Sequence, residues 1–177
     1  TLIKITKNNQ IIRAMPNTPA LIKMGITGFF ATKNISLKTR RQAFKILSQI
    51  GEVVELPNEN MIDTVTAISG SGPGYIFKFI SAIEKAAINA GLPKAFLRKF
   101  IHTTLVGSVQ LWEKSDVDSK DLMLRVASKG GTTEEALNHL DAGNFDDLII
   151  RAVEKAKNKS KYLSLEINKQ IEEHSKK

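Results

Sequence analysis

The chain contains no cysteine among its 177 residues. That absence excludes disulfide bonds, a thiolate nucleophile and any metal site built on cysteine. Long apolar runs are also missing, because no stretch approaches the roughly 18 consecutive apolar residues that predict a membrane-spanning helix. The N-terminal stretch lacks the pattern of a secretory signal peptide. We therefore expect a soluble cytoplasmic protein with no membrane partner.

Recognisable groups of catalytic or metal-binding side chains are scarce as well. The three histidines, His102, His139 and His174, lie far apart, and no pair has zinc-ligand spacing, so we expect no metal site. The aspartates in residues 116–121 lack the glycine and glutamate of a calcium-binding loop, and helix-start residues are the simpler interpretation. No GxSxG motif marks a nucleophilic serine.

Positive charge is in excess, but it is concentrated at one end of the chain. The formal net charge is +8. Residues 151–177 contribute half of it, since eight Lys and Arg residues stand there against four Glu. A lysine-rich terminal helix usually has a solvated face. No helix-turn-helix, RNP-type or zinc-finger pattern accompanies it, so we expect no nucleic-acid partner.

Hydrophobic periodicity predicts a small α/β part followed by helices. Residues 26–32 and 52–57 have strand-like composition and flank a helical pattern over 37–51, which predicts one βαβ unit, too small to form a complete sheet alone. Strand signals end at residue 58, and five helices are predicted at 73–91, 93–113, 119–127, 133–142 and 145–172. The prediction is a mainly α protein with two domains, 1–57 and 58–177.

The predicted helices are unusually apolar. The helix over 73–91 carries apolar residues on most sides, which is typical of a buried helix. With links this short, we expect the five helices to bury against a second copy of the chain as well as against each other.

The segment RVASKGGTTEEALNHL, residues 125–140, places paired glycines before a predicted helix. Thr132 and Glu135 have the spacing of a capping box, in which each side chain bonds the other's backbone N–H, and this needs no ligand. Gly130 and Gly131, however, permit positive φ and close approach, and free N–H groups at a helix N-terminus form an anion site. On these residues alone, both interpretations stay open.

Two further turns are rich in donors. RAMPNTPAL, residues 13–21, has a proline on either side of Asn17 and Thr18, which predicts a rigid turn. SGSGPGY, residues 69–75, has Pro73 at the expected first position of a helix. Each has a purely structural explanation, as a turn or as a tightly packed helix start. Three such turns in a chain without acid–base groups favour a site in which a cofactor carries the chemistry.

The segments MPNTPAL, MIDTVTAISGSGPGYIF and SKGGTTEEAL, in this order, resemble the pyrroline-5-carboxylate reductase family. The resemblance runs from about residue 11 to about residue 156. It implies an all-helical dimerisation domain preceded by the last βαβ remnant of a Rossmann-type α/β domain. It further implies a homodimer, often within a larger ring, that uses NADPH or NADH to reduce the C=N bond of Δ1-pyrroline-5-carboxylate to L-proline.

The resemblance also assigns roles to the three turns. The cofactor-binding residues would be Met15, Pro16, Asn17, Thr18, Ser69, Gly70, Ser71, Gly72 and Pro73. The substrate-binding residues would be Ser128, Gly130, Gly131, Thr132 and Thr133, in a loop that faces the cofactor domain of the other subunit. Backbone N–H groups would hold the substrate carboxylate, and the Thr133 hydroxyl, the catalytic group, would meet the ring nitrogen.

The chain departs from the family pattern at two places. It has Lys129 where the family has proline, and no GxGxxG turn follows a strand, so the pyrophosphate-binding turn is missing. Since Thr1 also stands where a translated protein has methionine, we expect a C-terminal portion of the enzyme that is inactive alone. The alternatives are a related NAD(P)-dependent reductase of another small acid and a non-catalytic helical dimerisation remnant.

Overall fold

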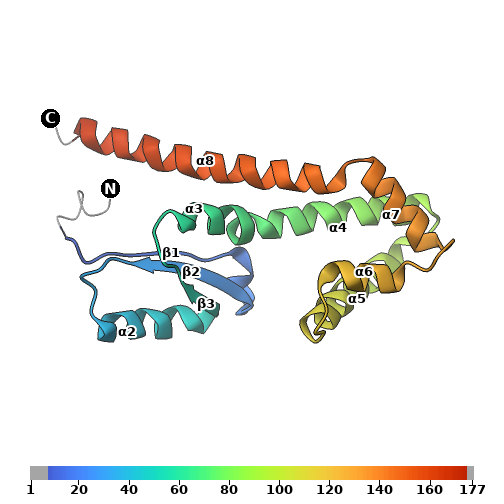
Figure 1. Ribbon diagram of the computed structural model, residues 1–177, viewed down its shortest axis with the longest axis horizontal. Coiled ribbons are helices and arrows are strands. Elements are labelled where there is room, and N and C mark those ends of the chain that lie inside the picture. Colours follow the sequence, from blue (N-terminus) through green and yellow to red (C-terminus); the bar gives the residue numbers. More distant parts are fainter. Residues whose placement is uncertain (1–7, 175–177) are drawn as a thin grey trace. The chain divides into compact units, whose positions relative to one another are not determined.

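The computed structural model describes residues 8–174, apart from the side chains of Glu172 and His174 (Figure 1). Thr1, the terminal lysines and the His174 side chain, on which some of the sequence-based expectations depend, lie outside that part. Within it, no helix combines the length and the apolar character needed to cross a bilayer. The described chain divides into two compact units: residues 8–75 with 150–174, and residues 76–149.

The first unit contains a three-stranded sheet in the order β1-β2-β3. Strand β1 (Ile12–Met15) pairs antiparallel with β2 (Gly25–Ala31), and β2 pairs parallel with β3 (Gly51–Glu55). Helix α2 (Leu37–Leu47) and the short 3-10 turn η2 (Ser48–Ile50) connect the two parallel strands. The predicted βαβ unit is therefore confirmed, whereas β1 was not predicted from periodicity.

The core of this unit forms where α2 covers the sheet. Phe29, Ala31 and Ile35 are buried, and Ile12, Leu47 and Val53 pack against them. Ser36 begins α2 by accepting a hydrogen bond from the Thr39 N–H at 3.1 Å. Burial of β2 between α2 and the helices that follow β3 fixes the position of the strand ends.

Helices follow the sheet without a further strand in the described residues. Helix α3 (Met61–Val65), a π-helical turn η3 (Thr66–Gly70) and helix α4 (Gly72–Asn89) succeed one another almost without a break. Helix α3 packs on the sheet, because a Cβ built at Gly28 would lie 2.9 Å from Val65 Cγ1. The first segment of the first unit ends at residue 75, whereas the sequence predicted a division at residue 57. The predicted domain division stays a prediction.

The second unit is helical. It contains α5 (Lys94–Glu113), α6 (Ser119–Val126) and α7 (Thr132–Ala142), and α8 (Phe145–His174) begins in it and continues into the first unit. The five predicted helices are confirmed within a few residues at each end. Asp118 accepts from the Asp121 N–H at 2.9 Å, so the interpretation of that aspartate as a helix-start residue is also confirmed.

The prediction that the helix after residue 73 is buried is wrong for the single chain. Helix α4 has no buried residue, and the side chain of Phe77 is 63% exposed. Long helices with apolar sides and few neighbours leave more apolar surface than one chain covers.

Candidate functional site

The MPNTP segment forms a turn, as predicted, and lies at the end of β1. Asn17 precedes the 3-10 turn η1 (Thr18–Ile22), and its Oδ1 accepts from the Ile26 N–H of β2 at 2.9 Å. The Asn17 carbonyl accepts from the Ala20 N–H at 3.1 Å. Asn17 therefore closes the turn through its backbone carbonyl and joins the turn to β2 through its side chain.

This turn still has groups to offer a ligand. Asn17 uses its amide oxygen in the fold, while its Nδ2 donor and the hydroxyl of exposed Thr18 take part in no hydrogen bond within the described residues. A donor held in place by its own side-chain oxygen has little freedom left to lose on binding.

The SGSGP segment is built differently from the expectation. We expected a fresh helix start with Pro73 at its first position, but α4 begins at Gly72 and follows the π turn directly. The Ser71 N–H donates to the Thr66 carbonyl at 2.8 Å, and the Gly74 N–H donates to the Ser71 carbonyl at 2.9 Å. The N–H groups of Ser71 and Gly74 are therefore used within the chain.

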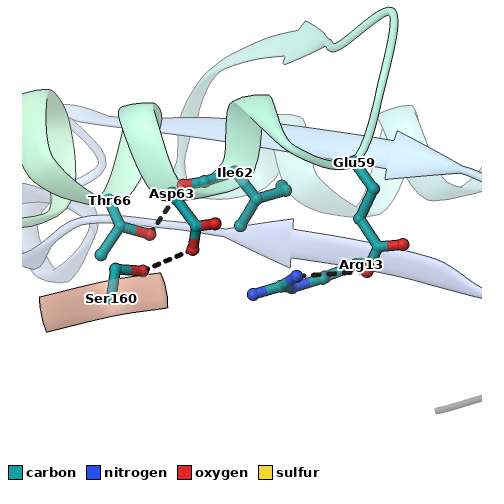
Figure 2. Close-up of polar contacts among 6 residues, drawn as sticks. All are labelled: Arg13, Glu59, Ile62, Asp63, Thr66 and Ser160. Carbon is teal, nitrogen blue, oxygen red and sulfur yellow. Dashed lines mark hydrogen bonds and ion pairs between the residues drawn. The ribbon is translucent and has the colours of Figure 1, made fainter. Parts of the chain in front are cut away.

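Proline chemistry explains the π turn. Pro73 has no N–H, and in a continuous α-helix its ring would collide with the carbonyl of Ser69, four residues earlier. The wider turn moves that carbonyl aside. Hydroxyl groups satisfy carbonyls around it: Thr66 Oγ1 donates to the Ile62 carbonyl at 2.8 Å (Figure 2), and Ser69 Oγ donates to the Val65 carbonyl at 3.0 Å.

The structure brings the two predicted cofactor segments together. A Cβ built at Gly70 would lie 2.5 Å from Met15 Cε, so the last side chain of β1 rests against the π turn. By contrast, a Cβ at Gly72 would meet no atom within 4 Å. A side chain at position 70 would therefore displace the end of the Met15 side chain, whereas position 72 faces open space.

The loop before α7 has a different cap from the predicted one. Gly131 is the N-cap residue, with φ −88° and ψ 167°, and it has no side chain to bond the helix. Glu134, rather than Glu135, reaches back, and its Oε2 accepts from the Gly130 N–H at 2.7 Å. The predicted Thr132–Glu135 capping box is thus wrong by one residue, because the helix starts at Thr132, one residue earlier than a Thr132 cap requires.

Positions 130 and 131 of this loop favour glycine for different reasons. Gly130 has φ +72°, a conformation that favours glycine, as predicted for the pair. Gly131 has an ordinary negative φ, but a Cβ there would lie 2.8 Å from the Ser128 carbonyl oxygen. Its N–H donates to that same carbonyl at 2.9 Å. The loop is therefore a closed turn rather than an open row of donors.

Few donors of this loop remain for a ligand. The N–H groups of Gly130 and Gly131 already have partners, whereas those of Thr132 and Thr133 lie in the first helical turn and have none among the described residues. Thr133 is half-buried, and Lys129 is exposed. An open groove of about 520 Å³ along α7 is lined by Thr132, Glu135, Ala136, His139 and Leu140.

Two residues with a part in these segments escaped the sequence analysis. Tyr75 donates its hydroxyl to the Ala67 carbonyl at 3.1 Å, across the π turn. Glu134 bonds the glycine turn. A glutamate three residues after Gly131 was a usable signal for a cap, while nothing in the spacing of Tyr75 and Ala67 indicated their bond.

The comparisons with known proteins agree with one another. A family model described as pyrroline-5-carboxylate reductase dimerisation matches residues 59–163, more than half of the chain. The pyrroline-5-carboxylate reductase of Pseudomonas aeruginosa is 36% identical over 87% of this chain and 56% of its own length. That of Synechocystis is 38% identical over 88% of this chain and 58% of its own length. The chain thus spans about half the length of the curated relatives it matches.

Solved structures resemble the chain over the same extent. A crystal structure of Plasmodium falciparum pyrroline carboxylate reductase with NADP bound has a TM-score of 0.84 and 33% identity, over 88% of this chain and 59% of that one. The Coxiella burnetii pyrroline-5-carboxylate reductase has a TM-score of 0.81 and 36% identity, over 87% and 57%. The predicted fold class, mainly α with a small α/β part, is confirmed.

Proposed function

Because the chain belongs to the pyrroline-5-carboxylate reductase family, we propose that its protein reduces the C=N bond of Δ1-pyrroline-5-carboxylate to L-proline, with NADPH or NADH as reductant. The observation that carries the proposal is the contact of Met15 with Gly70, which joins two of the three motif turns. The reaction consumes one hydride and one proton per C=N bond and has no need of a nucleophile or a metal.

The joined turns form the part of the cofactor site that this chain supplies. It comprises Met15, Pro16, Asn17, Thr18, Ser69, Gly70, Ser71, Gly72 and Pro73. Asn17 Nδ2 and the Thr18 and Ser71 hydroxyls provide unpaired polar groups, and the empty space beside Gly72 lets a planar ring approach the backbone. NADPH or NADH supplies the hydride when bound, and the P. falciparum relative with NADP bound supports this choice.

The glycine loop is the substrate part of the site, made of Ser128, Gly130, Gly131, Thr132 and Thr133. The free N–H groups of Thr132 and Thr133 at the positive end of α7 suit a carboxylate. The Gly130 N–H joins them only when the substrate carboxylate replaces Glu134. The hydroxyl of Thr133, the catalytic residue, orients the ring nitrogen, and a neutral group there does not oppose a protonated imine.

The proposal includes a homodimer, with a larger ring as its extension. The family match is to a dimerisation region, and apolar side chains such as Phe77 and Trp112 are largely exposed in the single chain. In this arrangement the loop of one subunit meets the cofactor turns of the other, so an isolated monomer lacks a complete site. The cytoplasmic location stays a prediction.

Thr133→Val tests the catalytic assignment in the protein that includes any sequence encoded before Thr1. The change removes the orienting hydroxyl, and we expect kcat to fall about tenfold to hundredfold. Cofactor affinity should stay the same. The measurement is pyrroline-dependent oxidation of NADPH, with Thr104→Val as control, because Thr104 is exposed on α5 and lies outside the three turns.

Three results would count against the proposal or against one of its parts. An intact wild-type protein that oxidises NADPH with another small cyclic or open-chain acid, but not with the pyrroline, would favour a related reductase. A dimer that binds neither NADPH nor NADH would favour the second candidate, association without catalysis, which the match to a dimerisation region alone supports. An unchanged rate in Thr133→Val would remove Thr133 from the catalytic role.

A further inference from the structure

The π turn η3 leaves one buried carbonyl without its α-helical donor. In an α-helix the Ser71 N–H would donate to the Ala67 carbonyl, four residues earlier. Here it donates to Thr66, five residues earlier, at 2.8 Å. Ala67 is 0% exposed, so water cannot take over as the partner of its carbonyl. A buried carbonyl without a donor destabilises the turn that contains it.

Tyr75 supplies the missing donor. Its hydroxyl donates to the Ala67 carbonyl oxygen at 3.1 Å, and Tyr75 itself is half-buried just beyond Pro73. Pro73 forces the turn to widen, and the wider turn takes the α-helical donor away from the Ala67 carbonyl. The Tyr75 hydroxyl, two residues after Pro73, then bonds that carbonyl. The π arrangement therefore depends on the Tyr75 hydroxyl as well as on Pro73.

The other end of the turn is held independently. Thr66 Oγ1 donates to the Ile62 carbonyl at 2.8 Å, and Ser160 Oγ of α8 donates to Asp63 Oδ1 at 2.7 Å (Figure 2). These two bonds hold α3 and the start of the turn, whereas the Tyr75 bond acts at the exit of the turn toward Gly72. Gly70 lies at that exit, against Met15 Cε.

We propose that Tyr75 is a positioning residue for the cofactor, because its hydroxyl bond to the Ala67 carbonyl keeps residues 69–72 against the end of β1. Tyr75 touches neither the MPNTP turn nor the loop before α7 through any hydrogen bond of the described residues. Its effect is confined to where Ser69, Gly70 and Ser71 lie relative to Met15. The inference rests on the proposed function, since that assigns the cofactor to these turns.

Tyr75→Phe tests the inference because it keeps the ring and removes only the hydroxyl. We expect the dissociation constant for NADPH to rise about tenfold, the loss that one hydrogen bond corresponds to, with the KM for the pyrroline unchanged. In the 177-residue chain without cofactor, we expect NMR shifts of the Ala67 carbonyl carbon and the Ser71 amide to move, because the carbonyl loses its donor and the turn beside it rearranges.

Tyr162→Phe is the matched control. It removes the hydroxyl of the only other tyrosine, which donates to Glu166 Oε1 at 2.6 Å on the surface of α8. This variant should leave both the NADPH dissociation constant and the two NMR signals as in the wild type. A lower melting temperature shared by both variants would report stability and not positioning.

The outcomes separate the inference from the function on which it rests. If Tyr75→Phe shifts the NMR signals but binds NADPH as tightly as the wild type, the hydroxyl is structural and the inference is wrong. If neither changes, Tyr75 does not hold the turn at all. If the wild-type protein binds neither NADPH nor NADH, the proposed function fails and takes the cofactor role of Tyr75 with it, whatever the NMR signals show.

Discussion

Glu134 and Glu135 carry the same charge at the same end of α7, yet they differ in what they bond. The Glu134 carboxylate accepts from the Gly130 N–H at 2.7 Å and is half-buried, whereas Glu135 is exposed. Both side chains interact favourably with the positive end of the helix. A difference in stability between variants at these two positions therefore reports the charge-assisted bond between Glu134 and the Gly130 N–H.

We expect Glu134→Ala to lower the free energy of unfolding by about 1 kcal/mol more than Glu135→Ala does, the usual size of a helix-cap contribution. The two variants lose the same charge, so their common loss reports the interaction with the helix end. Urea unfolding followed by circular dichroism measures both. Equal effects would show that the Gly130 bond contributes nothing to stability.

The same residues show how far local patterns lead. The sequence GGTTEE predicts a capped helix, and the helix and its back-bonding glutamate are present. The spacing favours Thr132 with Glu135, because a capping box needs a hydroxyl at the N-cap, whereas the structure has Gly131 as N-cap and Glu134 as the residue that reaches back. The choice follows from the contact of Gly131 with the Ser128 carbonyl and from the positive φ of Gly130, which are properties of the folded turn.

Among the elements, α8 and α3 are joined by one hydrogen bond between side chains. Ser160 donates to Asp63 at 2.7 Å, and both residues are half-buried (Figure 2). Removing the donor leaves the Asp63 carboxylate without this partner in a partly desolvated place, which costs more than the bond itself contributes.

Ser160→Ala should therefore lower the free energy of unfolding by about 1–2 kcal/mol. Ser164→Ala is the control, because Ser164 lies one turn further along the same helix and its hydroxyl takes part in no bond among the described residues. Thermal unfolding of Ser160→Ala, Ser164→Ala and Asp63→Asn measures the stability of each variant. A Ser160→Ala protein as stable as Ser164→Ala would contradict the docking role of the bond.

Elements with a sustained hydrophobic period or a clear composition could be predicted from the sequence, and the short or irregular elements could not. The five long helices follow from apolar spacing, and β2, α2 and β3 follow from composition. Strand β1 has only four residues, IRAM, too short for alternation to stand out. The π turn depends on Pro73, on hydroxyls that bond carbonyls, and on Tyr75, and no hydrophobic period encodes these together.

At the scale of the whole molecule, the chain leaves more apolar surface uncovered than a soluble monomer usually does. Trp112, the only tryptophan, is 56% exposed and lines an apolar groove of about 260 Å³ between α5 and α6. The family match names this helical region for dimerisation. Association is the consequence that the composition and the structure support jointly.

We expect sedimentation equilibrium at micromolar concentration to give twice the 19.6 kDa mass of the chain. Burial of apolar surface between copies would favour the dimer, so dilution should restore the single mass. Tryptophan emission followed through the same dilution series should move to longer wavelength if dissociation exposes Trp112 to solvent. A chain that sediments at its single mass at all concentrations would contradict the proposed homodimer.

The bond between Ser160 and Asp63 joins residues that are 97 positions apart, and it has a consequence for how the chain folds. The second unit, residues 76–149, lies between the two segments of the first, so a ribosome delivers it completely before α8 can reach α3. Until α8 is synthesised, α3 lacks its contact with that helix. Contacts of such long sequence separation form slowly. Synthesis of the first unit therefore begins before that of the second, and the first unit closes only after the second is complete.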